Sequence, residues 1–335
     1  MTAEQADAIR SGAVSRPVAP ADRPAALDRG WTIHVENAHM LRGPMATVGA
    51  MLQRTLGGMP LRGNLYGSPP GSPATGVHHD AYDAVVVQFA GRKRWYVWDR
   101  TELGLPADPV LSMPWRDHDP HVGASAARTI VLEPGDVLVV RRGDPHAAVA
   151  LAGGMSLHGT FMVAAPTAQD FLRHVATAAA QDESCRTVLP PPGLRVDDRT
   201  ADWAAGALVG LLRWLEGADH VALVEDFLRQ WVVQAPPPSD RAEADPPVEA
   251  AAGDPRLHAR LGGRPFALLR SSVVVQQAER PLTPAMLHLV SRCMADPDGW
   301  HAVDREPGWS AAAAAELEDL VSSDVLAVRT GPQVP

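Results

Sequence analysis

Residues Asn64–Asp99 read NLYGSPPGSPATGVHHDAYDAVVVQFAGRKRWYVWD and contain the triplet His78-His79-Asp80 ahead of two β-rich runs. A Gly-Arg turn at 91–92 separates these two runs. Successive side chains of an extended segment point to opposite faces, so His78 and Asp80 share a face and His79 points the other way. An imidazole and a carboxylate side by side are two of the three ligands in a 2-His-1-carboxylate triad, which holds non-haem Fe(II). The stretch therefore predicts part of an iron site on a strand.

The best candidate for the third ligand is His146, within Leu132–Ala150 (LEPGDVLVVRRGDPHAAVA). The P-G-D segment in this stretch is a turn, Val137–Val140 is an apolar strand, and His146 opens the strand after the next turn. Two hairpins that each deliver a ligand to one barrel mouth are typical of a cupin-type double-stranded β-helix. His158, on the expected closing strand, competes for the same position. The P-G-D context favours His146, and we expect His158 to be a pocket or core residue.

Five motifs follow one another in this part of the chain: N-x-Y, H-x-D, Q-x-x-G-x-K-x-W, P-G-D with a late histidine, and S-L-H-x-T. Their order resembles that of the JmjC-type oxygenases of the cupin superfamily, and it is most similar to the ribosomal-oxygenase branch. The resemblance is strong over roughly residues 30–165 and covers the remainder only as domain order. It implies a dependence on Fe(II), 2-oxoglutarate as co-substrate, and O2.

The resemblance also implies roles for individual residues. It assigns His78, Asp80 and His146 to iron, Lys93 to the distal carboxylate of 2-oxoglutarate, and Asn64 and Tyr66 to further co-substrate contacts. The lysine also makes chemical sense by itself. A co-substrate with two carboxylates needs a cation at the end far from the metal. Alternation sends Arg92 and Arg94 to the opposite face, where we expect solvent or a substrate rim.

Other polar and aromatic residues near these motifs are expected to be structural. We expect His79 to lie outside the ligand set, and Gln88 and Trp95 to pack the barrel. The segment 100–127 is expected to be a loop over the barrel mouth that could contact substrate. The segment contains Trp115, His118, Asp119 and His121. Its histidine and aspartate residues resemble a metal site, but they lack the strand spacing that fixes ligand geometry.

The chain as a whole is predicted to be a mixed α+β protein. Residues 1–165 are expected to form a jelly-roll catalytic domain of the cupin/JmjC type, and 166–234 a helical segment opening after an N-cap at Thr167. The composition of 235–255 is that of a linker. Residues 256–335 are expected to form a winged-helix-like domain. The resemblance implies a homodimer made through the helical segment.

Composition limits the classes of partner. The net charge of −9 argues against general nucleic-acid binding, and acidic residues offset the arginines of 256–335, so direct DNA binding is not expected. The two cysteines, Cys185 and Cys293, predict neither a disulfide framework nor a cysteine-rich zinc site. The sequence shows no apolar signal core and no run of transmembrane length. We therefore expect a cytoplasmic protein in a reducing compartment that keeps iron ferrous.

The predicted function is hydroxylation of an amino-acid side chain in a protein or peptide by an Fe(II)- and 2-oxoglutarate-dependent oxygenase. An acidic chain suits a basic partner, such as a ribosomal protein. Alternatives are a tailoring hydroxylase for a natural product or modified peptide, a cupin with another metal, and a non-catalytic scaffold or regulator. Lys93 and Asn64 argue against the other-metal cupin, and the complete triad argues against the scaffold. The substrate, the modified atom, and hydroxylation versus demethylation stay open at this point.

Overall fold

The structure of the chain is a computed structural model, and it describes residues 17–73, 76–103, 113–114, 127–163, 165–188, 198–233, 257–262, 264, 266–275, 278–297, 299–303 and 308–330. The chain divides into two compact units. The first unit comprises Met1–Ala165, Pro236–Phe266 and Leu282–Pro335, and the second comprises Pro166–Ala235 and Ala267–Pro281. The segment expected to be a linker, 235–255, lies outside the described residues.

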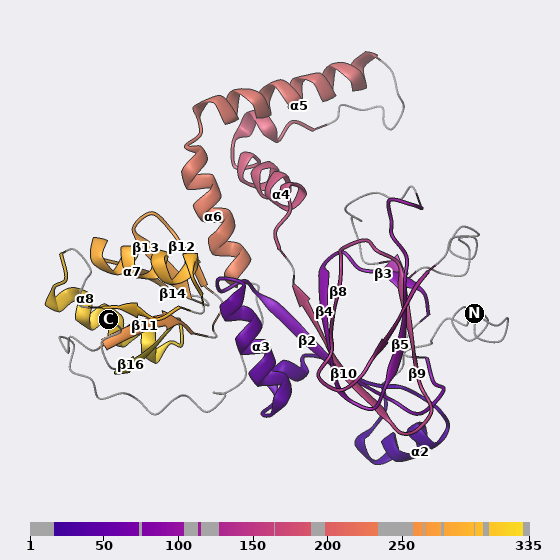
Figure 1. The fold of residues 1–335 in the computed structure, drawn as a ribbon. Coiled ribbons are helices and arrows are strands. Elements are labelled where there is room, and N and C mark those ends of the chain that lie inside the picture. Colours follow the sequence, from indigo (N-terminus) through magenta and orange to yellow (C-terminus); the bar gives the residue numbers. More distant parts are fainter. Residues whose placement is uncertain are drawn as a thin grey trace. The chain divides into compact units, whose positions relative to one another are not determined.

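Two antiparallel five-stranded sheets make up the N-terminal part of the first unit (Figure 1). One sheet has the order β1-β2-β10-β4-β8 and the other the order β6-β3-β9-β5-β7. The strands are β1 (Ile33–Val35), β2 (Leu61–Ser68), β3 (His78–His79), β4 (Asp83–Ala90), β5 (Lys93–Val97), β6 (Met113–Pro114), β7 (Arg128–Leu132), β8 (Val137–Val140), β9 (His146–Ala150) and β10 (Ser156–Val163). Successive strands mostly alternate between the sheets, which confirms the prediction of a double-stranded β-helix in a mixed α+β protein.

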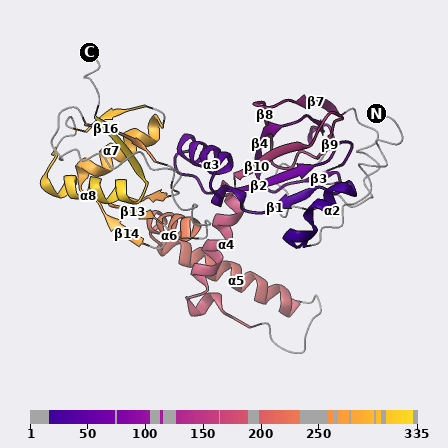
Figure 2. The ribbon, with the colours of Figure 1, turned by 90° about the horizontal axis from the view of Figure 1, so that it is seen from below.

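Alternation of side chains along the strands creates the interior between the two sheets. Strand β4 buries every second residue, and Val86 from β4 packs with Trp95 of β5, Leu132 of β7 and Ala148 of β9. These residues join the two sheets into one core. In Figure 2, the first sheet runs from its β1 edge, beside α2 (Arg23–Asp28), to its β8 edge.

Helix α3 (Pro44–Thr55) covers the outer face of the first sheet. It begins with proline in its first turn, and Met45 packs with Leu61 and Phe161 in a second cluster. Gly159 of β10 leaves the space that Met45 occupies, since a Cβ there would collide with the methionine sulfur. Met51 does not join this cluster and is 46% exposed, so the methionines of α3 are only partly core residues.

The turn between β4 and β5 fixes where Lys93 stands. Gly91 has a φ of 61°, and a Cβ at this position would overlap the carbonyl of Met155. Glycine is therefore the residue that this tight connection accommodates. The turn makes Lys93 the first residue of β5, with its side chain on the buried face of the strand.

The second unit contains three helices and a small sheet. The helices are α4 (Ala168–Ala179), α5 (Asp198–Gly217) and α6 (His220–Val233). Thr167 caps α4 in a reciprocal pair with Asp170, which confirms the predicted N-cap. Strand β13 (Ser272–Val275) pairs with β14 (Ala278–Pro281), next to β12 (Phe266–Leu268), and Val274 packs against Val232 of α6.

The C-terminal part of the first unit combines helices and another sheet, with the order β15-β11-β16. Its elements are β11 (Leu257–Leu261), α7 (Pro284–Ala295), β15 (His301–Ala302), α8 (Ala311–Ser322) and β16 (Leu326–Thr330). Buried residues of α7 and α8 supply its core, among them Met286, Leu289 and Leu317. Nowhere in the described ranges does a helix combine the length and apolar character that crossing a membrane requires.

Candidate metal centre

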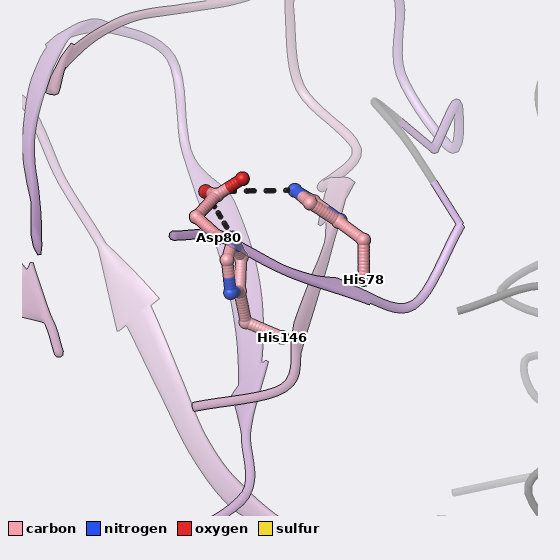
Figure 3. Close-up of side chains that lie close together, drawn as sticks. All are labelled: His78, Asp80 and His146. Atoms are coloured by element: carbon pink, nitrogen blue, oxygen red, sulfur yellow. Dashed lines mark ion pairs between the residues drawn. The ribbon is translucent and has the colours of Figure 1, made fainter. Parts of the chain in front are cut away.

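Strands β3 and β9 bring His78, Asp80 and His146 together inside the barrel (Figure 3). His78 and His146 are paired across the two strands, and Asp80 follows β3 directly. One Asp80 oxygen, Oδ2, lies 4.0 Å from His78 Nε2 and 3.6 Å from His146 Nε2. The three ligand atoms lie within 4.8 Å of one another. A single small cation between them would therefore contact all three residues.

Backbone carbonyls fix the orientation of both imidazoles. His78 Nδ1 lies 2.9 Å from the Gly76 carbonyl oxygen, and His146 Nδ1 lies 3.0 Å from that of Asp144. In the neutral ring, Nδ1 donates to the carbonyl and Nε2 keeps a free lone pair, which a metal needs. Burial, together with the charge of His78, lowers the pKa of His146 to about 3, so its ring is neutral at physiological pH.

Tyr82 supports the carboxylate of Asp80 and was not anticipated from the sequence. Its hydroxyl donates a hydrogen bond to Asp80. Burial raises the pKa of Asp80, while His78 and the Tyr82 hydrogen bond oppose that rise by favouring the ionised form. Asp80 and Tyr82 are two residues apart, and this spacing in H-x-D-x-Y was the available signal.

These donors fit a divalent transition metal. Two imidazole nitrogens and one carboxylate converge here, which is the ligand set that non-haem Fe(II) sites use. His79 does not belong to the cluster, in agreement with the expected alternation. The cluster Trp115, His118, Asp119 and His121 lies outside the described residues.

Lys93 lies deeper in the same barrel and is fully buried. Its ammonium group donates to Ser68 Oγ at 2.9 Å and lies 3.2 Å from His158 Nδ1. Burial lowers the pKa of Lys93 to about 7, and neither neighbour carries a negative charge to compensate. Among the described residues, no carboxylate forms an ion pair with it. The site is therefore suited to an anionic group from a ligand.

Ser68, which accepts from Lys93, is in turn hydrogen-bonded to Thr32. The Thr32 hydroxyl lies 2.9 Å from Ser68 Oγ and 2.7 Å from the carbonyl oxygen of Pro73. Ser68 is itself fully buried at the end of β2. Sequence reasoning missed Ser68 and Thr32, although Ser68 is two residues from Tyr66 on the same strand and therefore shares its face.

Tyr66 lies in the middle of a stack of three rings. Its ring is 4.4 Å from that of His34 and 4.9 Å from that of His158, with nearly parallel planes. Burial raises the pKa of Tyr66 to about 12, although a hydrogen bond with Asn64 opposes the rise. The Asn64 side chain also accepts a hydrogen bond from the backbone N–H of Asn37, which ties β2 to the segment after β1.

His158 is buried beside Lys93 and not among the candidate ligands. Its Nδ1 faces the ammonium group, so this nitrogen must be unprotonated to accept a hydrogen bond. Burial, followed by the charge of Lys93, lowers the pKa of His158 well below its usual value. His158 is thus a pocket residue, as its sequence context suggested.

Replacing Lys93 with methionine should stabilise the metal-free protein at neutral pH. The folded state holds this lysine with a pKa near 7, well below its unfolded value, so burial costs most when the lysine is charged. The cost is complete below pH 7 and disappears as the pH rises towards the unfolded pKa of about 10.4. We expect Lys93→Met to raise the melting temperature by several degrees at pH 7 and by much less at pH 10. Equal shifts at both pH values would contradict a buried ammonium group.

The comparisons with known proteins agree with this geometry. Residues 44–171 match the family model described as JmjC domain. Human Ribosomal oxygenase 1 is 36% identical over 137 residues, which make up 39% of this chain and 20% of that protein. The bifunctional lysine-specific demethylase and histidyl-hydroxylase NO66 of Drosophila erecta is 35% identical over 100 residues, which make up 30% of this chain and 15% of that protein.

The chain thus spans no more than about a fifth of the length of these curated relatives. Among solved structures, the X-ray structure of E. coli ycfD aligns with 97% of this chain and 90% of its own, with a TM-score of 0.54 and 18% sequence identity. At this identity the likeness concerns the fold. The matched region holds His78, Asp80, Lys93 and His146. The similarity of this chain to the JmjC family therefore lies in residues 44–171, which include the candidate metal ligands.

Proposed function

We propose that this protein is an Fe(II)- and 2-oxoglutarate-dependent oxygenase that hydroxylates an amino-acid side chain in a protein or peptide. The proposal rests on one observation: the interior of the barrel contains two complementary features. One is the set of metal ligands His78, Asp80 and His146. The other is the buried, uncompensated ammonium group of Lys93. A ligand with two anionic ends would satisfy both.

The strand register supports a ligand of this kind. His146 is paired with Val97 and Ala150 with Lys93, so the metal ligand and the lysine are four residues apart along β9. At about 3.3 Å per residue, this separation is roughly 13 Å between backbone positions. The Lys93 side chain spans part of it, and an extended dicarboxylate fits the remainder.

The roles of the side chains follow from their contacts. His78, Asp80 and His146 would hold Fe(II), which when bound supplies the activation of O2. Lys93 would neutralise the distal carboxylate of 2-oxoglutarate, and Tyr66 and Asn64 would line the same pocket. Burial of these groups excludes water, which strengthens the attraction between the ammonium group and the carboxylate.

The names of the curated relatives support a protein substrate, since they include a ribosomal oxygenase and a histidyl-hydroxylase that is also a lysine-specific demethylase. We therefore propose a basic protein, such as a ribosomal protein, as the substrate. The net charge of −9 is complementary to such a partner. Hydroxylation is the reaction that we propose over demethylation.

Anaerobic titration with Fe(II) and 2-oxoglutarate tests the proposal. We expect the weak visible charge-transfer band of iron chelated by a 2-oxo acid in the wild type. The band should be absent in His78→Ala, which loses a ligand. It should require at least about tenfold more 2-oxoglutarate in Lys93→Ala, because a charged hydrogen bond is lost. Arg92→Ala, on the exposed side of the adjoining turn, is the matched control and should behave as wild type. Iron-loaded wild type without a band would exclude 2-oxoglutarate as co-substrate.

We further propose a homodimer formed through the helices of the second unit. Three apolar residues of α5 are strongly exposed, namely Leu208, Val209 and Leu212. Leu208 and Leu212 are one helical turn apart, so they share a face that a second copy of the chain would cover.

We also propose that the C-terminal α/β region is a winged-helix-like domain without direct DNA binding, and that the protein works in the cytoplasm.

Light scattering after size exclusion tests the dimer. We expect twice the chain mass of 35.7 kDa for the wild type at micromolar concentration. Leu208→Glu combined with Leu212→Glu should give the monomer mass, because two carboxylates would be buried in the interface. Val188→Glu, another exposed apolar residue, is the control and should remain a dimer. A monomeric wild type would exclude the proposal.

A further inference from the structure

Trp95 contains a buried hydrogen-bond donor that has no partner. The side chain is 4% exposed, and its indole Nε1–H meets no acceptor within the described structure. Buried polar groups in folded proteins are nearly always hydrogen-bonded, and an unpaired one points to a missing partner. The sequence suggested only that Trp95 packs the barrel. Its ring does so, but the N–H group is left unexplained.

The strand register places Trp95 between the two anionic subsites. Along β5 and β9, Lys93 is paired with Ala150, Trp95 with Ala148, and Val97 with His146. Trp95 and Lys93 are two residues apart and therefore share the interior face. Along β5, the Trp95 backbone thus lies midway between Val97, which is paired with His146, and Lys93.

Ring contacts confirm this intermediate position. The indole centroid is 6.1 Å from that of His146 and 5.4 Å from that of His158. The rest of the ring packs against apolar side chains of both sheets, including Val86, Leu132 and Ala148. These neighbours offer no acceptor, and they hold the ring in place.

The amide oxygen of Gln88, on β4 of the same barrel, is a buried acceptor that also lacks a partner among the described residues. The Gln88 nitrogen donates to the Ala90 carbonyl oxygen at 2.7 Å and to Ser156 Oγ at 3.0 Å. Because these bonds fix the direction of the amide, the structure does not pair its oxygen with Trp95. The indole N–H group is therefore free to donate to a molecule bound inside the barrel.

We propose that Trp95 Nε1–H donates a hydrogen bond to a carboxylate oxygen of the bound dicarboxylate co-substrate, from its position between the metal ligands and Lys93. This inference rests on the proposed function. It makes Trp95 a binding residue in addition to a core residue.

The test uses Zn(II)-loaded protein, because Zn(II) is diamagnetic and has no redox chemistry. Calorimetry measures 2-oxoglutarate binding to wild type, Trp95→Phe and Trp98→Phe. Trp98 is a matched control, since it is equally buried but packs with Tyr96 and Ala147 on the other face. We expect about tenfold or greater weakening in Trp95→Phe, the effect of losing a hydrogen bond to a charged group. Trp98→Phe should bind as wild type does.

The indole N–H resonance of Trp95 provides a second readout that does not depend on a variant's stability. Nitrogen-15 spectra of the wild type identify this peak by its absence in Trp95→Phe. We expect it to shift strongly when 2-oxoglutarate is added. Calorimetric binding with an unmoved peak would overturn the role of Trp95 and leave the proposed function intact. A wild type that does not bind 2-oxoglutarate at all would overturn both.

Discussion

Burial of the Lys93 ammonium group beside neutral partners is the constraint on which this site depends. Ser68 and His158 accept its hydrogen bonds but supply no negative charge, and burial lowers its pKa to about 7. A protein selected only for stability would replace such a lysine with an apolar residue of similar size. Its retention is explained if a carboxylate from a ligand completes the pair. The free-energy cost of burying the Lys93 ammonium group without a counter-charge is then offset when the co-substrate binds.

The double-stranded β-helix explains how distant residues serve this one ligand. Strands β3 and β9, from two distant parts of the chain, place His78 opposite His146. The register of β5 against β9 pairs Lys93 with Ala150, four residues along β9 from His146. The Gly91 turn fixes the start of β5, so the register and the position of the cation are determined together. Along β5, Trp95 lies between Lys93 and the residue paired with His146, and its N–H group has no hydrogen-bond partner in the described part of the chain.

Much of this arrangement was predictable because it follows from local periodicity and from the motif order. Alternation placed His78 and Asp80 on one face and excluded His79. The P-G-D turn favoured His146 over His158, and Lys93 was expected at the start of its strand. Tyr82, Ser68 and Thr32 were not anticipated, because their roles depend on which strands are neighbours. The unpaired indole N–H group of Trp95 also could not be inferred, because a sequence does not show whether a buried tryptophan has a hydrogen-bond acceptor beside it. Asn64, which was expected to contact the co-substrate, accepts a hydrogen bond from the backbone of Asn37.

A crystal structure of the protein soaked with Mn(II) and 2-oxoglutarate would test the central claim most directly. The account predicts one metal ion bound by His78 Nε2, Asp80 and His146 Nε2, with the near end of 2-oxoglutarate on the metal. It also predicts the distal carboxylate within about 3 Å of Lys93 Nζ, the distance of a charged hydrogen bond. A metal ion bound elsewhere, or a 2-oxoglutarate whose distal carboxylate avoids Lys93, would contradict it.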